Sequence, residues 1–346
     1  MIGAGNPPPT FIARQINSLQ ALGVEIKHFP KFIKHTYTFT RLCQLGFSFH
    51  LPRQTKNLIR QADILHFQWP GHLINFGSLA KRYKKKIVLS LRGRQINILP
   101  YLPGQEKYVK NIKRILPQCD AYHCVSAEIL TRARNFGVVS ERAQVIYTAV
   151  DTDIFKPPQV LPTAPPTRIL MIGSIIWRKG YEYALVAFRH AIESGANATL
   201  TIVGSGEETD RLNFTISDLN LSDRVTHISH LNSKQVRDLI NNSHIFLHTA
   251  LSEGIANSVI EAMACGLPIV TTDVGGMSEA VNNHVEGFLI PPRDPEATAN
   301  ALLKLINSLD LRKQMGEAGR LRCLRQFNYD RYGSQFVDLY NKVLSS

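Results

Sequence analysis

Two adjacent cations in the second half of the sequence are suited to binding a diphosphate. Arg178 and Lys179 lie in a short segment between Gly173 and Gly180. Arg presents a planar fork of N–H donors and Lys a compact charge, so together they can neutralise a diphosphate leaving group. The alternative interpretation is a solvated basic loop without a binding role, which could contain the same two residues. The glycines on both sides, together with a strand before the segment and a helix after it, favour the functional interpretation.

Two carboxylates follow further along the chain, with seven residues between them. They are Glu253 and Glu261. A helix is predicted from about 257 to 265, because Ser258 and Glu261 have the spacing of a capping box and Gly266 follows as a stop. This pattern places Glu253 in the preceding loop and Glu261 in the first turn of the helix.

The predicted start of this helix could receive a diphosphate. A helix start exposes unpaired backbone N–H groups and the positive end of the helix dipole. Glu253 would then reach sugar hydroxyls, and Glu261 would accept hydrogen bonds from a ribose diol. For Glu261 alone, a purely structural role as the capping-box carboxylate is an equal alternative.

The elements that must position these residues alternate between strand-like and helical segments. Short β-branched or aromatic runs separate longer segments with helical spacing, which indicates an α/β fold with parallel sheets. Arg178 and Lys179 then follow a strand, at the carboxyl end of a sheet, where α/β folds bind ligands. The predicted strands are 64–67, 87–91, 121–125, 168–173, 198–203, 226–229, 245–248 and 268–272, and helices are predicted at 11–22, 73–84, 106–117, 181–194, 295–325 and 329–344.

A proline-rich stretch divides the chain. Five prolines occur between 155 and 167, where neither a helix nor a central strand can continue. A chain of 346 residues is also long enough for two domains. We therefore expect a first domain over 1–155, a linker over 156–167, a second domain over 168–328, and a final helix over 329–346 that crosses back to the first domain.

An ordered set of motifs in the second half resembles a known family. The motifs are Gly173 with Arg178-Lys179-Gly180, Val203-Gly204-Ser205-Gly206, Ser252-Glu253-Gly254 with Glu261 to Pro268, and Gly275-Gly276 with Glu279 and Glu286-Gly287. They resemble the retaining glycosyltransferases of family 4, also called group 1. The resemblance is strong over 168–294 and looser elsewhere. It implies the GT-B fold, in which two Rossmann-like doubly wound domains face each other across a cleft.

The resemblance also implies a role for each matching residue. The donor would be a nucleotide-diphosphate sugar, used without a cofactor or metal, with the acceptor held mostly by the first domain. The sugar would pass to a lipid-linked or polysaccharide acceptor, and front-face departure and attack would retain its configuration. Catalytic roles are expected for Glu253, Lys179, Arg178 and Arg92. Donor-binding roles are expected for Arg178, Lys179, Gly204, Gly206, Glu253, Ile255, Ala256, Asn257, Ser258 and Glu261.

The first domain departs from the family pattern near the reacting sugar. The family commonly has a His-Gly pair after a strand, and this chain has Arg92-Gly93 there. Arg cannot act as a neutral base. His66 and Arg94 are alternative candidates, although a buried core position explains His66 equally well. An Asp-x-Asp pattern at Asp151 resembles a metal motif of a different fold, and we reject that interpretation because the pattern leads into the linker.

The start of the sequence is unusual for a nucleotide-binding fold. A buried strand should precede the first loop, and in the doubly wound order it lies centrally in the sheet. Met1–Asn6 is short and rich in glycine, and the loop Asn6–Thr10 follows at once. We expect either a strand encoded upstream or a first domain that lacks a normal first strand.

Charge is concentrated in the first half of the chain. Residues 1–160 carry 23 Lys/Arg and 8 Asp/Glu, a net charge of +15, whereas 161–346 carry 17 and 19, a net charge of −2. This asymmetry predicts an anionic partner for the first domain, such as a membrane surface contacted through 84–86 and 107–114. No nucleic-acid motif is apparent, so no nucleic-acid partner is expected.

The expected location is cytoplasmic, peripheral at the inner membrane face. The five cysteines are too few and too irregular for a disulfide framework, and no apolar run approaches the ~20 residues that span a bilayer. Two alternatives to a transferase stay open. One is a GT-B enzyme of another reaction, such as an epimerase or phosphorylase. The other is a catalytically impaired homologue that binds nucleotide sugars or associates with membranes or nucleic acid.

Overall fold

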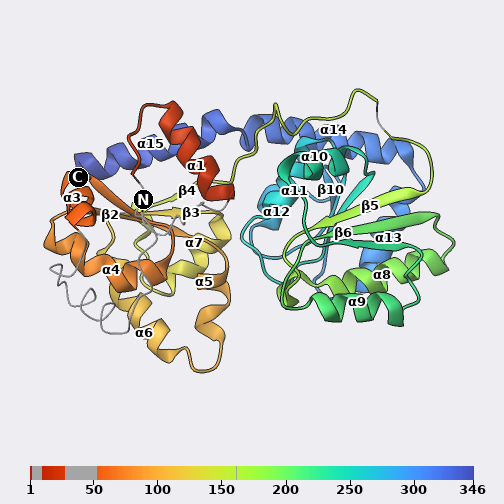
Figure 1. The fold of residues 1–346 in the computed structure, drawn as a ribbon, viewed down its shortest axis with the longest axis horizontal. Coiled ribbons are helices and arrows are strands. Elements are labelled where there is room, and N and C mark those ends of the chain that lie inside the picture. The colour runs from red at the N-terminus through yellow and green to blue at the C-terminus, as the bar shows by residue number, and fades with distance from the viewer. Residues whose placement is uncertain (2–9, 28–52, 161) are drawn as a thin grey trace. The chain divides into compact units, whose positions relative to one another are not determined.

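The computed structural model describes residues 1, 10–27, 53–160 and 162–346 (Figure 1). The expectation that Met1–Asn6 does not supply a normal first strand, and the predicted loop Asn6–Thr10, fall on residues 2–9, which lie outside the described residues. The described chain forms two compact units. Unit 1 contains Met1–Ala149 and Tyr329–Ser346, and unit 2 contains Val150–Asn328.

The described strands of unit 1 form a parallel sheet whose spatial order follows the sequence. The strands are β1 (Ile64–Phe67), β2 (Lys86–Leu91), β3 (Ala121–Cys124) and β4 (Ala143–Val145). Their apolar side chains alternate between the two faces of the sheet. One face packs on the connecting helices, including α4 (Pro70–Arg82), α6 (Glu106–Ile115) and α7 (Ala127–Arg134).

The other face of this sheet is covered by two helices from opposite ends of the sequence. Helix α1 (Thr10–Ala21) packs beside α15 (Tyr329–Ser345), as Figure 1 shows. The apolar residues of α15 recur every three or four positions, so they form one stripe that meets Val88 and Ala121 of the sheet. The last helix of the chain is therefore part of the core of unit 1. The stripe consists of Tyr332, Phe336, Leu339 and Val343.

Unit 2 contains a six-stranded parallel sheet in doubly wound order. The order is β10-β9-β8-β5-β6-β7, so the direction of winding reverses between β5 and β8. Ligands of such sheets bind outside the carboxyl ends of the strands at this reversal. The predicted α/β class is confirmed. The strands are β5 (Thr167–Ile172), β6 (Ala198–Val203), β7 (Val225–Ile228), β8 (Ile245–His248), β9 (Ile269–Thr272) and β10 (Gly287–Ile290).

Helices cover both faces of the second sheet. Apolar residues of α8, α9 and α13 pack on one face, and α11 packs against α14 on the other (Figure 1). The main helices are α8 (Tyr181–Glu193), α9 (Thr209–Asp218), α10 (Ser233–Asn241), α11 (Asn257–Ala264), α13 (Pro295–Ile306) and α14 (Leu309–Gln326). Shorter elements are α3 (Arg53–Gln61), α5 (Arg94–Asn97), α12 (Met277–Ala280), η1 (Leu99–Tyr101), η2 (Leu116–Gln118), η3 (Ser140–Arg142) and η4 (Trp177–Lys179).

The boundary between the units lies earlier than the sequence predicted. The segment 150–155 was expected in the first domain, but it belongs to unit 2. The N–H of Val150 donates to the carbonyl of Phe327 at 2.8 Å, and the Arg320 guanidinium donates to the carbonyl of Phe155 at 2.8 Å. These hydrogen bonds tie the segment to the end of α14.

Candidate functional site

The predicted cationic segment lies at the carboxyl end of β5, where the winding reverses. It forms η4 and ends at Gly180, whose φ of 64° lies in the left-handed region. A Cβ on Gly180 would lie 2.2 Å from the carbonyl oxygen of Thr249, so only glycine allows this close approach. The Thr249 hydroxyl donates to the Gly180 carbonyl at 2.9 Å, and the Leu251 N–H donates to the Arg178 carbonyl at 2.7 Å. The loop after β5 is thus fixed to the segment after β8.

This docking brings Arg178 and Lys179 to Glu253. The Lys179 Nζ lies 2.5 Å from Glu253 Oε2, and Arg178 Nη1 lies 3.9 Å from Oε1. The side chains of Lys179 and Glu253 are only 13% and 15% exposed, so water screens this pair weakly. Burial alone would raise the pKa of Glu253, but the Lys179 ammonium and the neighbouring His248 outweigh it and lower that pKa well below its usual range. Glu253 is therefore a carboxylate at neutral pH.

The backbone of Glu253 is held by a second close approach. Gly275 has a φ of 58°, and a Cβ there would lie 1.9 Å from the Glu253 carbonyl oxygen. The N–H of Gly276 donates to the Gly254 carbonyl at 2.7 Å. The loop after β9 thus packs directly on the loop that carries Glu253.

Helix α11 begins at Asn257, as expected, but the predicted capping box is wrong. The N-cap residue is Ala256, and its side chain makes no capping hydrogen bond. The Ser258 hydroxyl donates instead to the Ile172 carbonyl at 3.1 Å, which ties α11 to the end of β5. Glu261 consequently lies in the second turn rather than the first, where it is half-buried. Ile255 is buried immediately before the helix.

The predicted nucleotide loop, Gly204–Gly206, packs against the loop that follows β5. The Ile175 N–H donates to the Ser205 carbonyl at 3.0 Å. Cβ atoms on Gly204 and Gly206 would lie 1.9 and 2.1 Å from the carbonyl oxygens of Gly173 and Ile175. The loops after β5, β6, β8 and β9 therefore form one connected backbone framework around the start of α11.

Two residues at this edge were not identified from the sequence. His248 ends β8, and its Nδ1 lies 3.1 Å from the hydroxyl of Thr271 on β9. The other ring nitrogen, Nε2, lies 3.8 Å from Glu253 Oε2. Burial lowers the pKa of His248, so the ring is neutral. A histidine that ends a predicted strand five residues before Glu253 was the available signal.

The predicted catalytic Arg92 lies within unit 1. Its guanidinium donates to Gln68 Oε1 at 2.8 Å and more weakly to Gln15, and it stacks 4.6 Å from the centre of the Phe11 ring. Burial lowers its pKa, while interaction with Tyr332 opposes that shift. These contacts give Arg92 a structural role in joining α1, β1 and β2.

The alternative candidate His66 is part of a buried hydrogen-bond chain. Its Nδ1 lies 2.7 Å from the Tyr340 hydroxyl, and its Nε2 lies 2.8 Å from the Ser90 hydroxyl. Ser90 lies 2.8 Å from His123 Nδ1, and His123 Nε2 lies 3.0 Å from the Ile146 carbonyl. These hydrogen bonds run across three strands beneath α15, which supports the interpretation of His66 as a buried core residue. The other alternative, Arg94, is exposed at the start of α5.

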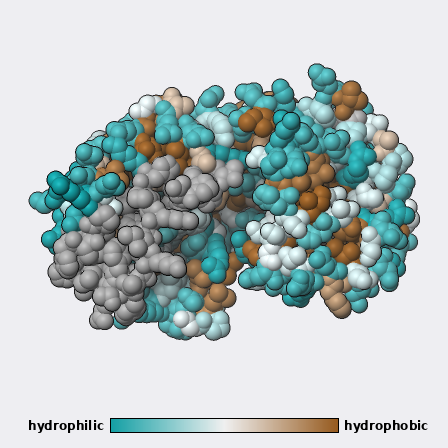
Figure 2. All heavy atoms as spheres, in the orientation of Figure 1, coloured by the Kyte–Doolittle hydropathy of each residue, from teal (hydrophilic) through white to brown (hydrophobic). Residues whose placement is uncertain are grey.

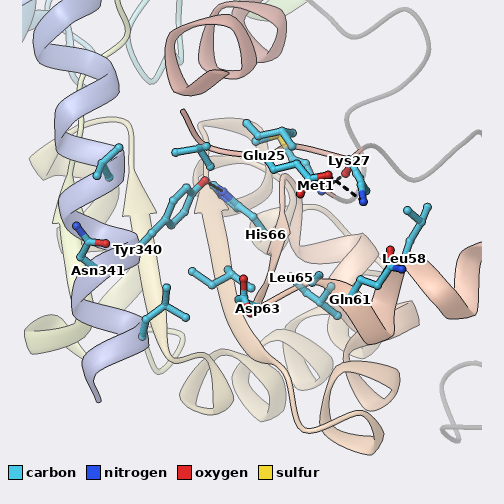
Figure 3. A pocket seen from close by; sticks show the side chains of 16 residues that line it. Met1, Glu25, Lys27, Leu58, Gln61, Asp63, Leu65, His66, Tyr340 and Asn341 are labelled. Carbon is cyan, nitrogen blue, oxygen red and sulfur yellow. Dashed lines mark hydrogen bonds and ion pairs between the residues drawn. The ribbon is translucent and has the colours of Figure 1, made fainter. Parts of the chain in front are cut away.

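A cavity of about 570 Å³ lies beside β1 in unit 1 (Figure 3). Figure 3 shows Tyr340 and His66 pointing toward each other at one side of it, while Met1 and Lys27 lie at another. None of the described residues that line it belongs to the site in unit 2.

The Asp-x-Asp pattern forms a turn. The carboxylate of Asp151 accepts hydrogen bonds from the N–H groups of Asp153 and Ile154, both at 3.0 Å.

Within the described residues, no three His, Cys, Asp or Glu side chains converge as a metal site. Among the helices of the same residues, none has the length and apolar character that crossing a membrane requires.

Comparison with known proteins identifies two family domains. Residues 154–322 match the glycosyl transferases group 1, and residues 9–154 match glycosyltransferase family 4. The chain is 26% identical over 293 residues to the N-acetyl-alpha-D-glucosaminyl L-malate synthase of Bacillus anthracis, covering 82% of this chain and 75% of that protein. It is 28% identical over 252 residues to the amylovoran biosynthesis glycosyltransferase AmsK of Erwinia amylovora, covering 70% and 61%. Matches to further relatives span about half their length or less.

Solved structures share the fold. A sucrose-phosphate synthase from Thermosynechococcus elongatus has a TM-score of 0.81 at 20% identity, covering 97% of this chain and 93% of that one. Anabaena HepE in complex with UDP has a TM-score of 0.74 at 17% identity, covering 94% and 88%. These likenesses establish the GT-B fold. Since the two family domains together extend from residue 9 to residue 322, the chain belongs to the group 1, or family 4, glycosyltransferases.

Proposed function

We propose that this protein transfers a hexosyl group from a nucleotide-diphosphate sugar to a glycan or lipid-linked acceptor, with retention of configuration. The observation that supports this most directly is the meeting of Lys179 and Arg178 with Glu253, next to the start of α11. A diphosphate needs fixed positive charge, and a sugar needs acceptors for its hydroxyl groups. This site offers both within one connected set of loops.

The two cations would hold the leaving diphosphate. Their side chains are partly buried, and the N-terminus of α11, where the Ala256 side chain makes no capping hydrogen bond, adds the positive end of a helix dipole. Fixed donors of this kind stabilise charge that develops on a leaving group by a few kcal/mol each, about 3 kcal/mol in the best-studied cases. Glu253 would accept hydrogen bonds from sugar hydroxyls.

The nucleoside would occupy the remaining part of the framework. We assign Glu261 to the ribose diol, the backbone of 255–258 to the sugar and phosphates, and Gly204 and Gly206 to the border of the nucleotide. HepE was solved in complex with UDP and with UDP-glucose, which supports a nucleotide sugar as the donor. UDP is therefore the first nucleotide to test.

Retention by front-face attack suits the charges in the site. Glu253 would be engaged by the sugar hydroxyls, so it is poorly available as a nucleophile. In the proposed step the bond between the anomeric carbon and the diphosphate oxygen breaks, and the acceptor hydroxyl oxygen bonds to the same face of that carbon. The acceptor proton passes to the departing diphosphate. No metal takes part, because the cations and the helix start supply the positive charge.

The acceptor is proposed from the names of relatives. AmsK is named for amylovoran biosynthesis, WcaL of Escherichia coli for colanic acid biosynthesis, and CapM of Staphylococcus aureus for capsular polysaccharide biosynthesis. A growing polysaccharide or its lipid-linked precursor is the acceptor that these names support. The reaction would extend such a chain by one sugar.

A basic surface of unit 1 could bring the enzyme to an anionic membrane. Helix α6 exposes four cations, and the segment before it exposes Tyr101 by 61% and Leu102 by 39%. Figure 2 shows hydrophobic residues exposed at the lower end of unit 1. By contrast, Lys85 donates to the Arg60 carbonyl and Lys86 pairs with Asp120, so 84–86 is the weaker candidate. The four cations of α6 are Lys107, Lys110, Lys113 and Arg114.

A donor screen followed by a transfer assay tests the proposal. Binding of UDP-, GDP- and ADP-sugars is measured by calorimetry, and the best donor is then incubated with lipid-linked oligosaccharide in the presence of EDTA. We expect one donor class to bind and transfer to continue with the chelator. Donor binding without transfer to any acceptor would indicate the impaired homologue, and loss of transfer in EDTA would contradict the metal-independent mechanism.

A further inference from the structure

His248 occupies a fixed position behind the proposed sugar-binding carboxylate. It is the last residue of β8 and is 4% exposed. Thr271 is its partner in the parallel register with β9, so the two side chains lie on the same face of the sheet. The Thr271 hydroxyl lies 3.1 Å from His248 Nδ1, which fixes the plane of the ring.

The second ring nitrogen points at Glu253. Nε2 is buried and, among the described residues, has no partner within hydrogen-bond distance; it lies 3.8 Å from Glu253 Oε2. An ionised carboxylate only accepts hydrogen bonds, so the neighbouring Glu253 favours the tautomer with its proton on Nε2. The Thr271 hydroxyl then donates to Nδ1 at 3.1 Å in preference to its longer contact, 3.5 Å, with the Thr272 carbonyl. The ring is neutral because burial and the positive charge of Lys179 and Arg178 disfavour protonation.

Lys179 and Arg178, which also contact Glu253, are the cations that the donor would use. Both would turn toward a bound diphosphate. His248 is neutral and buried, so a diphosphate would not draw it away. The distance of 3.8 Å between His248 Nε2 and Glu253 Oε2 can shorten to a hydrogen bond while Glu253 binds the sugar.

We propose that His248 is a positioning residue that holds Glu253 for sugar recognition, with its tautomer set by the Glu253 carboxylate and accommodated by the Thr271 hydroxyl. This role rests on the proposed function, because it assumes that Glu253 contacts the donor sugar. Its effect should therefore appear in binding of the sugar and not in binding of the nucleotide.

Calorimetry with UDP and UDP-glucose measures this difference. The amide group of Asn can take the place of the ring nitrogen Nδ1 only, and that of Gln can take the place of Nε2 only. We expect His248→Asn to weaken UDP-glucose binding about tenfold, the size expected for loss of a hydrogen bond to a charged group, and UDP binding less than twofold. His248→Gln should recover most of the loss. Equal weakening of both ligands, or wild-type binding of UDP-glucose by a folded His248→Asn variant, would overturn the proposal.

A measurement without ligand separates this proposal from the proposed function. The ¹⁵N and ¹H shifts of the His248 ring, assigned with His248→Asn, report the tautomer in the wild-type protein. We expect the proton on Nε2, and its presence on Nδ1 would overturn the positioning role whatever the ligand results. In Thr271→Val the proton should stay on Nε2, because the Glu253 carboxylate still accepts only from that nitrogen. Failure of the wild-type protein to bind any nucleotide sugar, with the proton on Nε2, would reject the proposed function and leave the geometry of His248 supported.

Discussion

The Lys179 ammonium and the Glu253 carboxylate, 74 residues apart in the sequence, meet at 2.5 Å at the carboxyl edge of the second sheet. Each neutralises the other in a site that is poorly exposed to water. A bound diphosphate would therefore compete with Glu253 for the same cation. The ion pair connects phosphate binding directly to the placement of the carboxylate that we assign to the sugar.

Replacing Lys179 should reduce turnover more than stability. We expect Lys179→Ala to lower kcat by at least a hundredfold, because it removes a fixed cation from the leaving group. The variant should still fold, since Arg178 stays near the carboxylate. Steady-state kinetics and thermal unfolding measure the two effects. Lys313→Ala, an exposed lysine of the same unit, is the matched control and should leave both unchanged.

A double variant separates charge balance from catalysis. In Lys179→Ala/Glu253→Gln the uncompensated buried carboxylate is removed together with the lysine. Stability should return toward that of the wild type while turnover stays low. Wild-type turnover in Lys179→Ala would contradict the assignment of Lys179 to the diphosphate.

Gly180 should be intolerant of a side chain. In Gly180→Ala the new Cβ meets the Thr249 carbonyl oxygen at 2.2 Å, in addition to the strain of a positive φ. Gly195 also has a positive φ, 87°, but nothing lies within 4 Å of its Cβ position. We expect Gly195→Ala to cost about 1 kcal/mol and Gly180→Ala to cost at least about 3 kcal/mol. Urea unfolding tests this, and equal costs at the two positions would show that the loop yields freely.

The sequence predicted those features of the site that depend on local pattern. Strand, loop and helix around Arg178 and Lys179, and the start of α11, follow from hydrophobic periodicity and glycine position. The capping box was wrong because Ser258 has the right spacing but is used by the Ile172 carbonyl, a tertiary partner. Local pattern cannot report which of two acceptors a hydroxyl will choose.

Long-range pairing explains what the sequence missed. The proposed role of His248 depends on its contacts with Thr271 on the neighbouring strand and with Glu253. No fixed sequence spacing between these residues signals either contact. The place of Arg92 after β2 predicts a catalytic role, whereas its contacts with Gln15 and Gln68 could not be predicted because they depend on how α1 and β1 pack. The boundary at 149 likewise depends on hydrogen bonds to the end of α14.

The hydroxyl of Tyr340 should contribute measurably to the stability of unit 1. Tyr340→Phe leaves His66 Nδ1 buried without its partner at 2.7 Å, which should cost about 1–3 kcal/mol. Tyr101→Phe is the control, because Tyr101 is 61% exposed and its loss should cost about 0.5 kcal/mol or less. Chemical unfolding followed by a probe in unit 1 gives both values. Equal stability of Tyr340→Phe and wild type would show that this hydrogen bond contributes nothing net.

The buried histidines beneath α15 should make unit 1 sensitive to mild acid. Burial lowers the pKa of His66 well below 6.5 and that of His123 to about 3, so both rings are neutral in the folded chain. Below pH 6.5 the unfolded chain binds more protons than the folded chain, so stability is fully present above that pH and falls as pH decreases toward the folded pKa. Each ring contributes a slope of roughly 1 kcal/mol per pH unit to the free energy of unfolding.

Unfolding free energies measured between pH 6.5 and 5, above the range where most carboxylates titrate, should show this slope. A His66→Gln/His123→Gln variant should be less stable at pH 7 but clearly flatter across this window, and a slope equal to that of the wild type would contradict the assignment.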